Sequence, residues 1–396
     1  MKVYVTGIGI VSALGLSVAA QLDALQQGRH GIRPVQFDGL KQTFLAAPVP
    51  ATNAELSKLC KRKPERASRT SLLGIVAAQQ CLVSATDHPE LRTGLISGTS
   101  VGGMDVTEQF YRRHLEQSQQ DFSALKLHDS GGTTSVIAES LGIHYYVNTI
   151  STACSSGANA IMQAARLIRA GKLDRVVAGG SDALTAFTIS GFNSLMIYNF
   201  ELCRPFDEHR NGLNLGEGAA YLLLESEESL KITGNTPLAL ISGWGNAADA
   251  FHQTATSPTA DGAVKSMQKA LAVSGIPASS IDYINAHGTG TKNNDLTESV
   301  AMQTIFGDTV PPFSSTKSFT GHTLAAAGAV EAVFSILALQ EQCLFPNLHF
   351  TEPVSETGLI PQQTFSAAPV KTVLSNSFGF GGNCTSLIFS SSNLNS

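Results

Sequence analysis

One cysteine stands where its thiol could act as a nucleophile. Cys154 lies among small residues in STACSSGANA (151–160), and the chain continues into IMQAARLIRAGK, whose apolar residues have helical spacing. If a helix begins at about Cys154, unpaired backbone N–H groups and the positive end of the helix dipole would lower the thiol pKa. Neighbouring backbone amides could then form an oxyanion hole. The alternative is a buried thiol that only packs, the common role of a single cysteine.

Two of the ten histidines are placed to assist such a nucleophile. His287 lies in NAHGTGTKNND, where the apolar segment IDYIN opens into a glycine- and threonine-rich turn. Strand ends of this kind are where α/β sheets place chemistry. His322 lies in STKSFTGHTLAAAGA, immediately before an alanine-rich segment, so it precedes a predicted helix as Cys154 does.

The elements that must position these residues recur along the chain. Short β-branched strands alternate with alanine-rich helices, which predicts an α/β fold with a buried parallel or mixed sheet. Segments of the first part resemble later ones: VYVTGIGIVSALG and LALISGWGNAADA, RTGLISGTSVGG and IDYINAHGTGTK, the helix after Cys154 and LAAAGAVEAVFSILALQ, DRVVAGGSDAL and KTVLSNSFGFGG. We predict two related halves, residues 1–235 with Cys154 and residues 236–396 with His287 and His322, whose symmetry brings the site together.

Composition excludes several other classes of protein. With 396 residues, 43% hydrophobic and 14% charged, the chain can bury a large core, and disorder is not expected. A formal charge of −5 argues against broad nucleic-acid binding. No apolar run reaches the length of about 18 residues that a membrane span needs. The six cysteines have no zinc-ligand spacing, so we expect no metal site, and reduced thiols fit a cytoplasmic protein.

Taken together and in this order, TACSSG, NAHGTGT, STKSFTGHTLAAAGA and NSFGFGG resemble the β-ketoacyl-acyl carrier protein synthases, condensing enzymes of the thiolase superfamily. The resemblance also covers VYVTGIGIVSALG and RPFDEHRNGLNLGEGAAYLLLE. It implies a thiolase-like fold, in which two related α/β halves form a layered α-β-α-β-α body. It also implies decarboxylative condensation of an acyl group with malonyl-acyl carrier protein, in fatty acid, polyketide or aryl-polyene biosynthesis.

The resemblance implies a role for each matching position. Cys154 matches the acyl-accepting nucleophile, and His287 and His322 match the two histidines of the triad. The other matches are the supporting residues Lys317 and Glu331, the gate and oxyanion-hole residue Phe380, the pantetheine-contacting residues Thr256, Thr289 and Thr291, and the acyl-tunnel residue Val101. No cofactor is implied, because decarboxylation drives formation of the carbon–carbon bond and the substrates are carried on an acyl carrier protein.

Departures and alternatives limit this interpretation. The connection MIYNFE, between SGFNSL and CRPFD, is short for the fatty-acid elongating enzymes, which leaves chain-length preference open. A thiolase would share the fold but use a second catalytic cysteine where this chain has Phe380. A non-condensing chain-length subunit would lose the nucleophile, and Cys154 argues against it. The expected assembly is a homodimer, with a heterodimer of a ketosynthase and a related subunit as the alternative.

A basic segment is the candidate carrier-docking surface. KRKPERASR (61–69) has five basic residues and one acid in a chain of negative net charge. A solvated helix start is the simpler interpretation of such a run. The resemblance implies that a basic segment here docks the acidic helix of the carrier, and positive charge would steer such a partner. We predict docking by Lys61, Arg62, Lys63 and Arg66, with Arg69 as a further candidate.

Overall fold

The computed structural model describes residues 1–60, 66–82, 88–116 and 122–392. Within these residues, ten strands form one mixed sheet in the order β10-β9-β13-β14-β8-β1-β7-β6-β4-β5. The strands of the first half are β1 (Val3–Val11), β4 (Thr93–Gly98), β5 (Tyr146–Ile150), β6 (Arg175–Asp182) and β7 (Gly218–Ser226). Those of the second half are β8 (Ala239–Ala248), β9 (Tyr283–Asn285), β10 (Phe313–Ser314), β13 (Thr372–Gly379) and β14 (Asn383–Ser390).

The strand order is symmetric about its centre. Outward from the middle, β1, β7, β6, β4 and β5 mirror β8, β14, β13, β9 and β10. On both sides the first two pairings are antiparallel and the next two are parallel. The segments that resemble one another in the sequence occupy equivalent places, β1 with β8, β4 with β9 and β6 with β13. The two halves meet where β1 pairs with β8, through Tyr4 with Leu240 and Val5 with Ala239.

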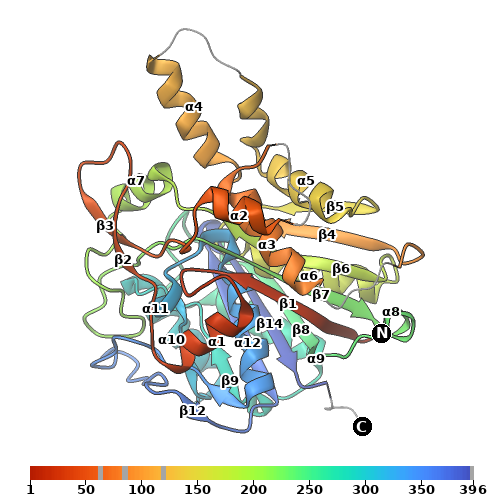
Figure 1. Cartoon of the computed structure of the whole chain (residues 1–396). Coiled ribbons are helices and arrows are strands. Elements are labelled where there is room, and N and C mark those ends of the chain that lie inside the picture. Colours follow the sequence, from red (N-terminus) through yellow and green to blue (C-terminus); the bar gives the residue numbers. More distant parts are fainter. Residues whose placement is uncertain (61–65, 83–87, 117–121, 393–396) are drawn as a thin grey trace.

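Helices form the other layers (Figure 1). Helix α3 packs on β1, β7 and β6, α9 packs on β8 and β14, and α6 and α12 pack on each other and on strands of both halves. The bounds are α1 (Val18–Gln26), α2 (Asn53–Leu59), α3 (Arg69–Cys81), α4 (Met104–Glu116), α5 (Ser130–Leu141), α6 (Ser156–Arg169), α7 (Ala186–Ser194), α8 (Glu227–Thr233), α9 (Asp261–Ser274), α10 (Lys292–Phe306), α11 (Lys317–Thr320) and α12 (Ala327–Glu341).

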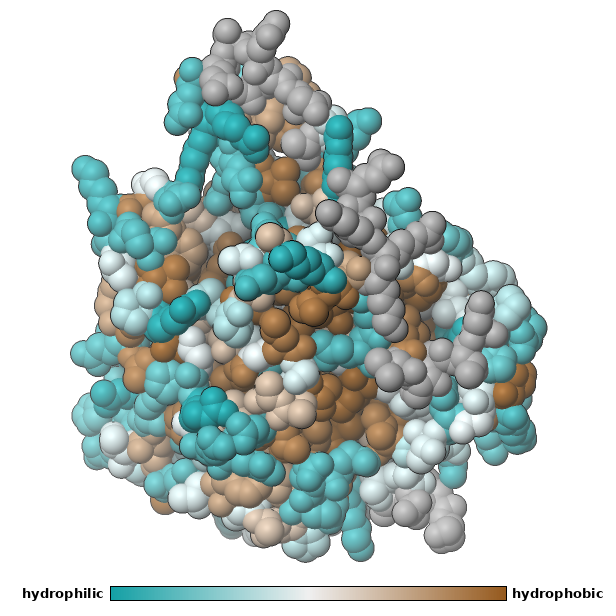
Figure 2. Space-filling model, in the orientation of Figure 1, coloured by the Kyte–Doolittle hydropathy of each residue, from teal (hydrophilic) through white to brown (hydrophobic). Residues whose placement is uncertain are grey.

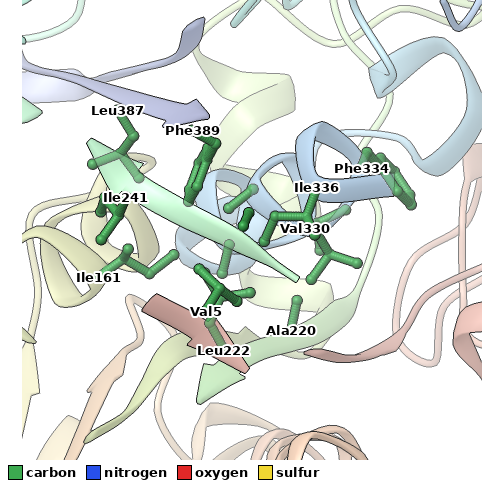
Figure 3. Close-up of a cluster of buried hydrophobic side chains, with 14 of the residues drawn as sticks. Val5, Ile161, Ala220, Leu222, Ile241, Val330, Phe334, Ile336, Leu387 and Phe389 are labelled. Atoms are coloured by element: carbon green, nitrogen blue, oxygen red, sulfur yellow. The ribbon is translucent and has the colours of Figure 1, made fainter. Parts of the chain in front are cut away.

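The largest core cluster joins the two halves. Figure 3 shows Val330, Phe334 and Ile336 of α12 facing apolar side chains of β7, β8 and β14. The residues of α12 from Ala327 to Leu339 are all buried, which explains why its sequence is apolar on every side. The segment Leu324–Glu341 has the length and hydropathy of a membrane span, yet it is 89% buried within the protein. It is a core helix of the protein.

Smaller elements lie at the edges of this body. Strands β2 (Arg33–Gln36) and β3 (Thr43–Ala46) form one hairpin, and β11 (Cys343–Leu344) pairs with β12 (Ser366–Ala367). Helix α4 projects from the body in Figure 1. Short 3₁₀ helices are η1 (Phe122–Leu127), η2 (Ala278–Ser280), η3 (Leu324–Ala326) and η4 (Phe380–Gly382). Figure 2 shows apolar side chains in the middle of one face, with hydrophilic side chains around them.

Candidate active site

Cys154 lies in the turn between β5 and α6. Helix α6 begins at Ser156 with Ser155 as its N-cap, so the expected start at Cys154 is two residues too early. The preceding residue, Ala153, has a φ of 52°, a conformation that a residue with a side chain seldom adopts. Cys154 is 5% exposed. This strained turn presents the thiol just ahead of the helix N-terminus.

The thiol pKa differs from the sequence-based prediction. Burial raises the pKa of Cys154 to about 11, and the nearby Lys317 ammonium and the backbone N–H groups of Phe380 and Cys154 lower it only in part. The prediction of a lowered pKa was wrong, because the free energy needed to remove the thiolate from water exceeds the stabilisation that the ammonium and the N–H groups provide. At neutral pH the thiol therefore keeps its proton.

The two N–H groups that face the sulfur come from opposite halves of the fold. Phe380 follows β13, whose last residue, Gly379, packs directly against the Cys154 turn. A Cβ at Gly379 would lie 2.8 Å from the Thr152 carbonyl oxygen and 3.3 Å from the Cys154 nitrogen. Only glycine allows this approach, which brings the Phe380 and Cys154 N–H groups together as an oxyanion hole requires.

His287 and His322 both direct a donor into the site. Their ring centroids are 5.5 Å apart and the rings are nearly perpendicular. His322 Nδ1 accepts the Leu324 backbone N–H at 3.1 Å, and His287 Nδ1 lies 3.2 Å from the Lys317 ammonium. With Nδ1 occupied as an acceptor, we assign the proton of each ring to Nε2. Burial and the Lys317 charge lower the pKa of both histidines well below 6.5, so both are neutral.

Lys317 and Glu331 form a buried ion pair behind His287. Each is 2% exposed, and the Lys317 ammonium donates to a Glu331 carboxylate oxygen and to the His287 carbonyl oxygen. Burial raises the pKa of Glu331 to about 7, against the lowering effect of Lys317. The contact with Glu331 holds the Lys317 ammonium next to His287 Nδ1, and this ammonium keeps Nδ1 a hydrogen-bond acceptor.

One cavity of about 340 Å³ contains the three candidate catalytic residues. Its lining includes Cys154, His287, His322 and Phe380, together with the predicted pantetheine residues Thr256, Thr289 and Thr291. The Thr256 hydroxyl donates to Asn293 Oδ1 at 2.8 Å, and the Thr289 and Thr291 hydroxyls lie 2.9 Å apart. The structure thus brings residues of both halves into one pocket.

Val101 lies outside the lining of this cavity. It is 6% exposed and belongs to an apolar cluster with Ile189, Leu213 and Leu324. Leu213 itself lines the cavity, so the cluster adjoins the site. To contact Val101, as the acyl-tunnel role requires, an acyl chain on Cys154 would have to pass between the side chains of this packed cluster.

Sequence reasoning missed several residues that shape the site. Glu298 accepts the His287 and Gly288 backbone N–H groups at 2.9 and 2.8 Å and so fixes the HGTGT turn. Asp182 accepts the Ala325 N–H at 2.8 Å and ties β6 to the turn after His322. The Phe192 ring stacks on Phe380 with centroids 5.7 Å apart. Glu298 lies in the second turn of α10, beyond the first-turn positions where an acid indicates a helix start, so no local pattern pointed to it.

The basic segment 61–69 is only partly described. Lys61, Arg62 and Lys63 lie outside the described residues, and Arg66 is exposed. Arg69 is not available for docking, because its guanidinium pairs with Glu217 at 2.5 Å and donates to the Ala51 carbonyl oxygen at 3.0 Å. Its inclusion as a docking candidate was wrong, since this arginine holds parts of the chain together.

Comparisons with known proteins agree with this geometry. Residues 1–229 match the family "Beta-ketoacyl synthase, N-terminal domain" and residues 238–351 match "Beta-ketoacyl synthase, C-terminal domain". Nodulation protein E of Rhizobium meliloti (strain 1021) is 34% identical, and 3-oxoacyl-[acyl-carrier-protein] synthase 2 of Staphylococcus aureus (strain N315) is 32% identical; each alignment covers 98% of both chains. The ishigamide ketosynthase/chain length factor structure superposes with a TM-score of 0.92 at 30% identity, over 98% of this chain and 99% of the other. The fold is therefore the thiolase-like fold of the ketosynthases.

Proposed function

This chain belongs to the β-ketoacyl synthase family, and from that premise we infer its reaction, the condensation of an acyl group with malonyl-acyl carrier protein to give a 3-oxoacyl-acyl carrier protein. It is an acyltransferase of fatty acid or polyketide biosynthesis. The observation that carries the assignment of roles is the convergence of Cys154, His287 and His322 on one cavity.

In the first half-reaction, Cys154 takes the acyl group from its carrier. The sulfur attacks the thioester carbonyl, the bond from that carbon to the pantetheine sulfur breaks, and the thiol proton leaves with the pantetheine. The Phe380 and Cys154 N–H groups stabilise the oxyanion that forms on the carbonyl oxygen.

In the second half-reaction, malonyl-carrier loses carbon dioxide. The Nε2–H groups of His287 and His322 donate to the malonyl thioester oxygen and stabilise the enolate that decarboxylation leaves. The enolate carbon attacks the acyl carbonyl, the bond to the Cys154 sulfur breaks, and the sulfur, released as a thiolate, takes a proton from solvent. Neutral histidines suit this role because each can donate its Nε2–H to the enolate oxygen and keep that proton throughout. We propose that no metal or redox cofactor takes part, since decarboxylation supplies the driving force.

The test of this function is a mass measurement. Incubation with an acyl-carrier thioester should add one acyl group to the protein, on the peptide that contains Cys154. Acyl donors of graded length would reveal the chain preference. A protein that stays unmodified with every donor, although folded, would instead be a partner subunit without condensing activity.

The acyl carrier protein is the proposed partner, docked by Lys61, Arg62, Lys63 and Arg66. Changing Lys63 and Arg66 to Glu should raise the KM for carrier-linked substrate and weaken its salt dependence, while turnover of a short pantetheine thioester stays nearly unchanged. Equal losses on both substrates would point to a folding role, and an unchanged KM for the carrier substrate would remove the segment from the interface.

A dimer is the proposed assembly, in the cytoplasm. The edge strand β5 supports it, because one side of β5 has no neighbour in the sheet of the described residues. Tyr145 directly before β5 and Val147 within it are 66% and 41% exposed. The ishigamide relative pairs a ketosynthase with a chain length factor, so the alternative is a heterodimer with a related subunit. Light scattering of the purified chain distinguishes them, since a chain that dimerises alone has twice the monomer mass.

A further inference from the structure

Three asparagines without a role in the chemistry above form a hydrogen-bonded network with Thr152 and Ser155, the neighbours of Cys154. Asn159 lies in α6, Asn246 in β8 and Asn383 at the start of β14. The Asn383 amide oxygen accepts from Asn159 Nδ2 at 2.8 Å and from Asn246 Nδ2 at 2.9 Å. The Ser155 hydroxyl lies 2.8 Å from the same oxygen. The uncharged amide oxygen of Asn383 therefore accepts hydrogen bonds from helix α6, from the residue after Cys154 and from strand β8.

Asn159 extends this network to the other side of Cys154. Its amide nitrogen donates to the Thr152 hydroxyl at 2.9 Å and to Asn383 Oδ1 at 2.8 Å, with the Ser155 hydroxyl at 3.4 Å as a third, longer contact. Its own carbonyl oxygen accepts the Thr385 hydroxyl at 2.8 Å and Asn246 Nδ2 at 3.2 Å. A buried amide that is fully hydrogen-bonded in this way has one preferred orientation, which is how such networks fix geometry.

Asn383 also closes the turn that carries the gate residue. It pairs with Gly379 across the β13–β14 hairpin, and the residues between them are Phe380, Gly381 and Gly382. Gly381 and Gly382 have φ values of 80° and 78°, so the turn depends on glycine and has little rigidity of its own. The position of the Phe380 N–H relative to Cys154 must therefore be set at the base of the turn, where Asn383 lies.

We propose that Asn383, through Asn159, is a positioning residue for the acylation half-reaction. Its amide oxygen holds the base of the Phe380 turn against the Thr152–Ser155 segment, so that the Phe380 and Cys154 N–H groups face one carbonyl oxygen. This inference rests on the proposed function of those two groups. An amide suits the position because it accepts several hydrogen bonds without adding a negative charge beside the thiol.

The inference predicts a selective loss. Asn383→Leu keeps a similar shape but removes the acceptor, so acylation of Cys154 should slow by about 10–10²-fold, less than the loss of a whole oxyanion-hole donor. Release of carbon dioxide from malonyl-carrier uses the histidine donors and should change less than about threefold. Asn383→Asp restores an acceptor of the same shape and should acylate about tenfold faster than the leucine variant, yet more slowly than the wild type because it adds a negative charge.

The control is Asn235→Leu, which removes a partly buried hydrogen bond to Glu225, and neither residue lines the cavity. It should alter neither half-reaction. If Asn383→Leu slows both half-reactions equally, or slows neither, the inference is wrong. Should that variant not fold, Asn383→Ser must show the same selective loss of acylation for the inference to stand. A wild-type protein that takes up no acyl group would overturn the proposed function and this inference with it, whereas an acylated wild type with no selective loss in Asn383→Leu would overturn the inference alone.

Discussion

At the active site, a protonated thiol and two neutral histidines surround one buried ammonium group. Lys317 lowers the pKa of Cys154, His287 and His322. Burial is the larger effect at each residue: it raises the pKa of the thiol and lowers the pKa of both histidines. The N–H groups of both histidines are therefore available as hydrogen-bond donors, and neither histidine takes the proton of the Cys154 thiol in the resting enzyme. Stabilisation of two successive anions by fixed donors follows from that balance.

Replacing the nucleophile separates the two half-reactions. Cys154→Ala should abolish acyl-enzyme formation and condensation, whereas decarboxylation of malonyl-carrier should persist because His287 and His322 keep their donors. Intact mass measures the first activity and release of carbon dioxide measures the second. Elongation retained by this variant would rule out Cys154 as the nucleophile.

The raised thiol pKa predicts a pH profile. With a pKa of about 11 for Cys154, the thiolate fraction is small at pH 7 and grows about tenfold with each pH unit until pH 10. Alkylation of Cys154 by iodoacetamide should rise by the same factor, because the thiolate is the attacking form. Peptide mass spectrometry from pH 7 to 10 measures it, with Cys154→Ala as the blank. A plateau below pH 9 would show that the helix N-terminus outweighs burial.

At the scale of elements, the site depends on a close contact between a strand and a turn. Strand β13 ends at Gly379 against the β5–α6 turn, and β9 ends ahead of His287, so strand ends of both halves meet at the cavity. Glu298 and Asp182 then fasten the turns through backbone N–H groups. Backbone placement, more than side-chain packing, sets this geometry.

Gly379→Ala tests that contact. The new methyl group would lie 2.8 Å from the Thr152 carbonyl oxygen, so β13 must shift and carry the Phe380 N–H with it. We expect acylation to fall by about 10²-fold and stability by about 1–3 kcal/mol. Gly191→Ala in α7 is the matched control, because a Cβ there meets nothing within 4 Å. It should leave acylation unchanged, and an equal effect of both substitutions would contradict the contact.

At the scale of the whole molecule, a buried core and a few ion pairs join segments far apart in the sequence. The core between the halves includes α6 and α12 and is apolar. Arg69 at the start of α3 contacts Glu217, just before β7, and the carbonyl oxygen of Ala51. Glu217 also accepts the Val49 and Leu184 backbone N–H groups. This pair ties four parts of the first half together.

Arg69→Ala should therefore destabilise the protein by about 3–5 kcal/mol, because it leaves the Glu217 carboxylate buried without its countercharge. Arg66→Ala, at an exposed position, should change stability by no more than about 0.5 kcal/mol. Thermal and denaturant unfolding measure both. Since Arg69 faces inward, its loss should not change the ratio of carrier-linked to pantetheine-linked turnover, and a change in that ratio would return it to the docking surface.

The sequence by itself determined the duplication and the type of chemistry. The paired segments, such as those of β1 and β8, show in the order of apolar and glycine-rich runs, because burial and turn geometry are local requirements. Cys154, His287 and His322 were each identified from a strand end or a helix start, for the same reason. Their motifs also carried the family resemblance.

Only the tertiary structure decided the electrostatics and the supporting contacts. The pKa of Cys154 depends on how much water is excluded around it, and that requires both halves in place. Arg69 and Glu217 are 148 residues apart, and Asn159 and Asn383 are 224 apart, so no local pattern could join them. Local spacing predicts which elements form, whereas burial and long-range hydrogen bonds arise only when those elements pack.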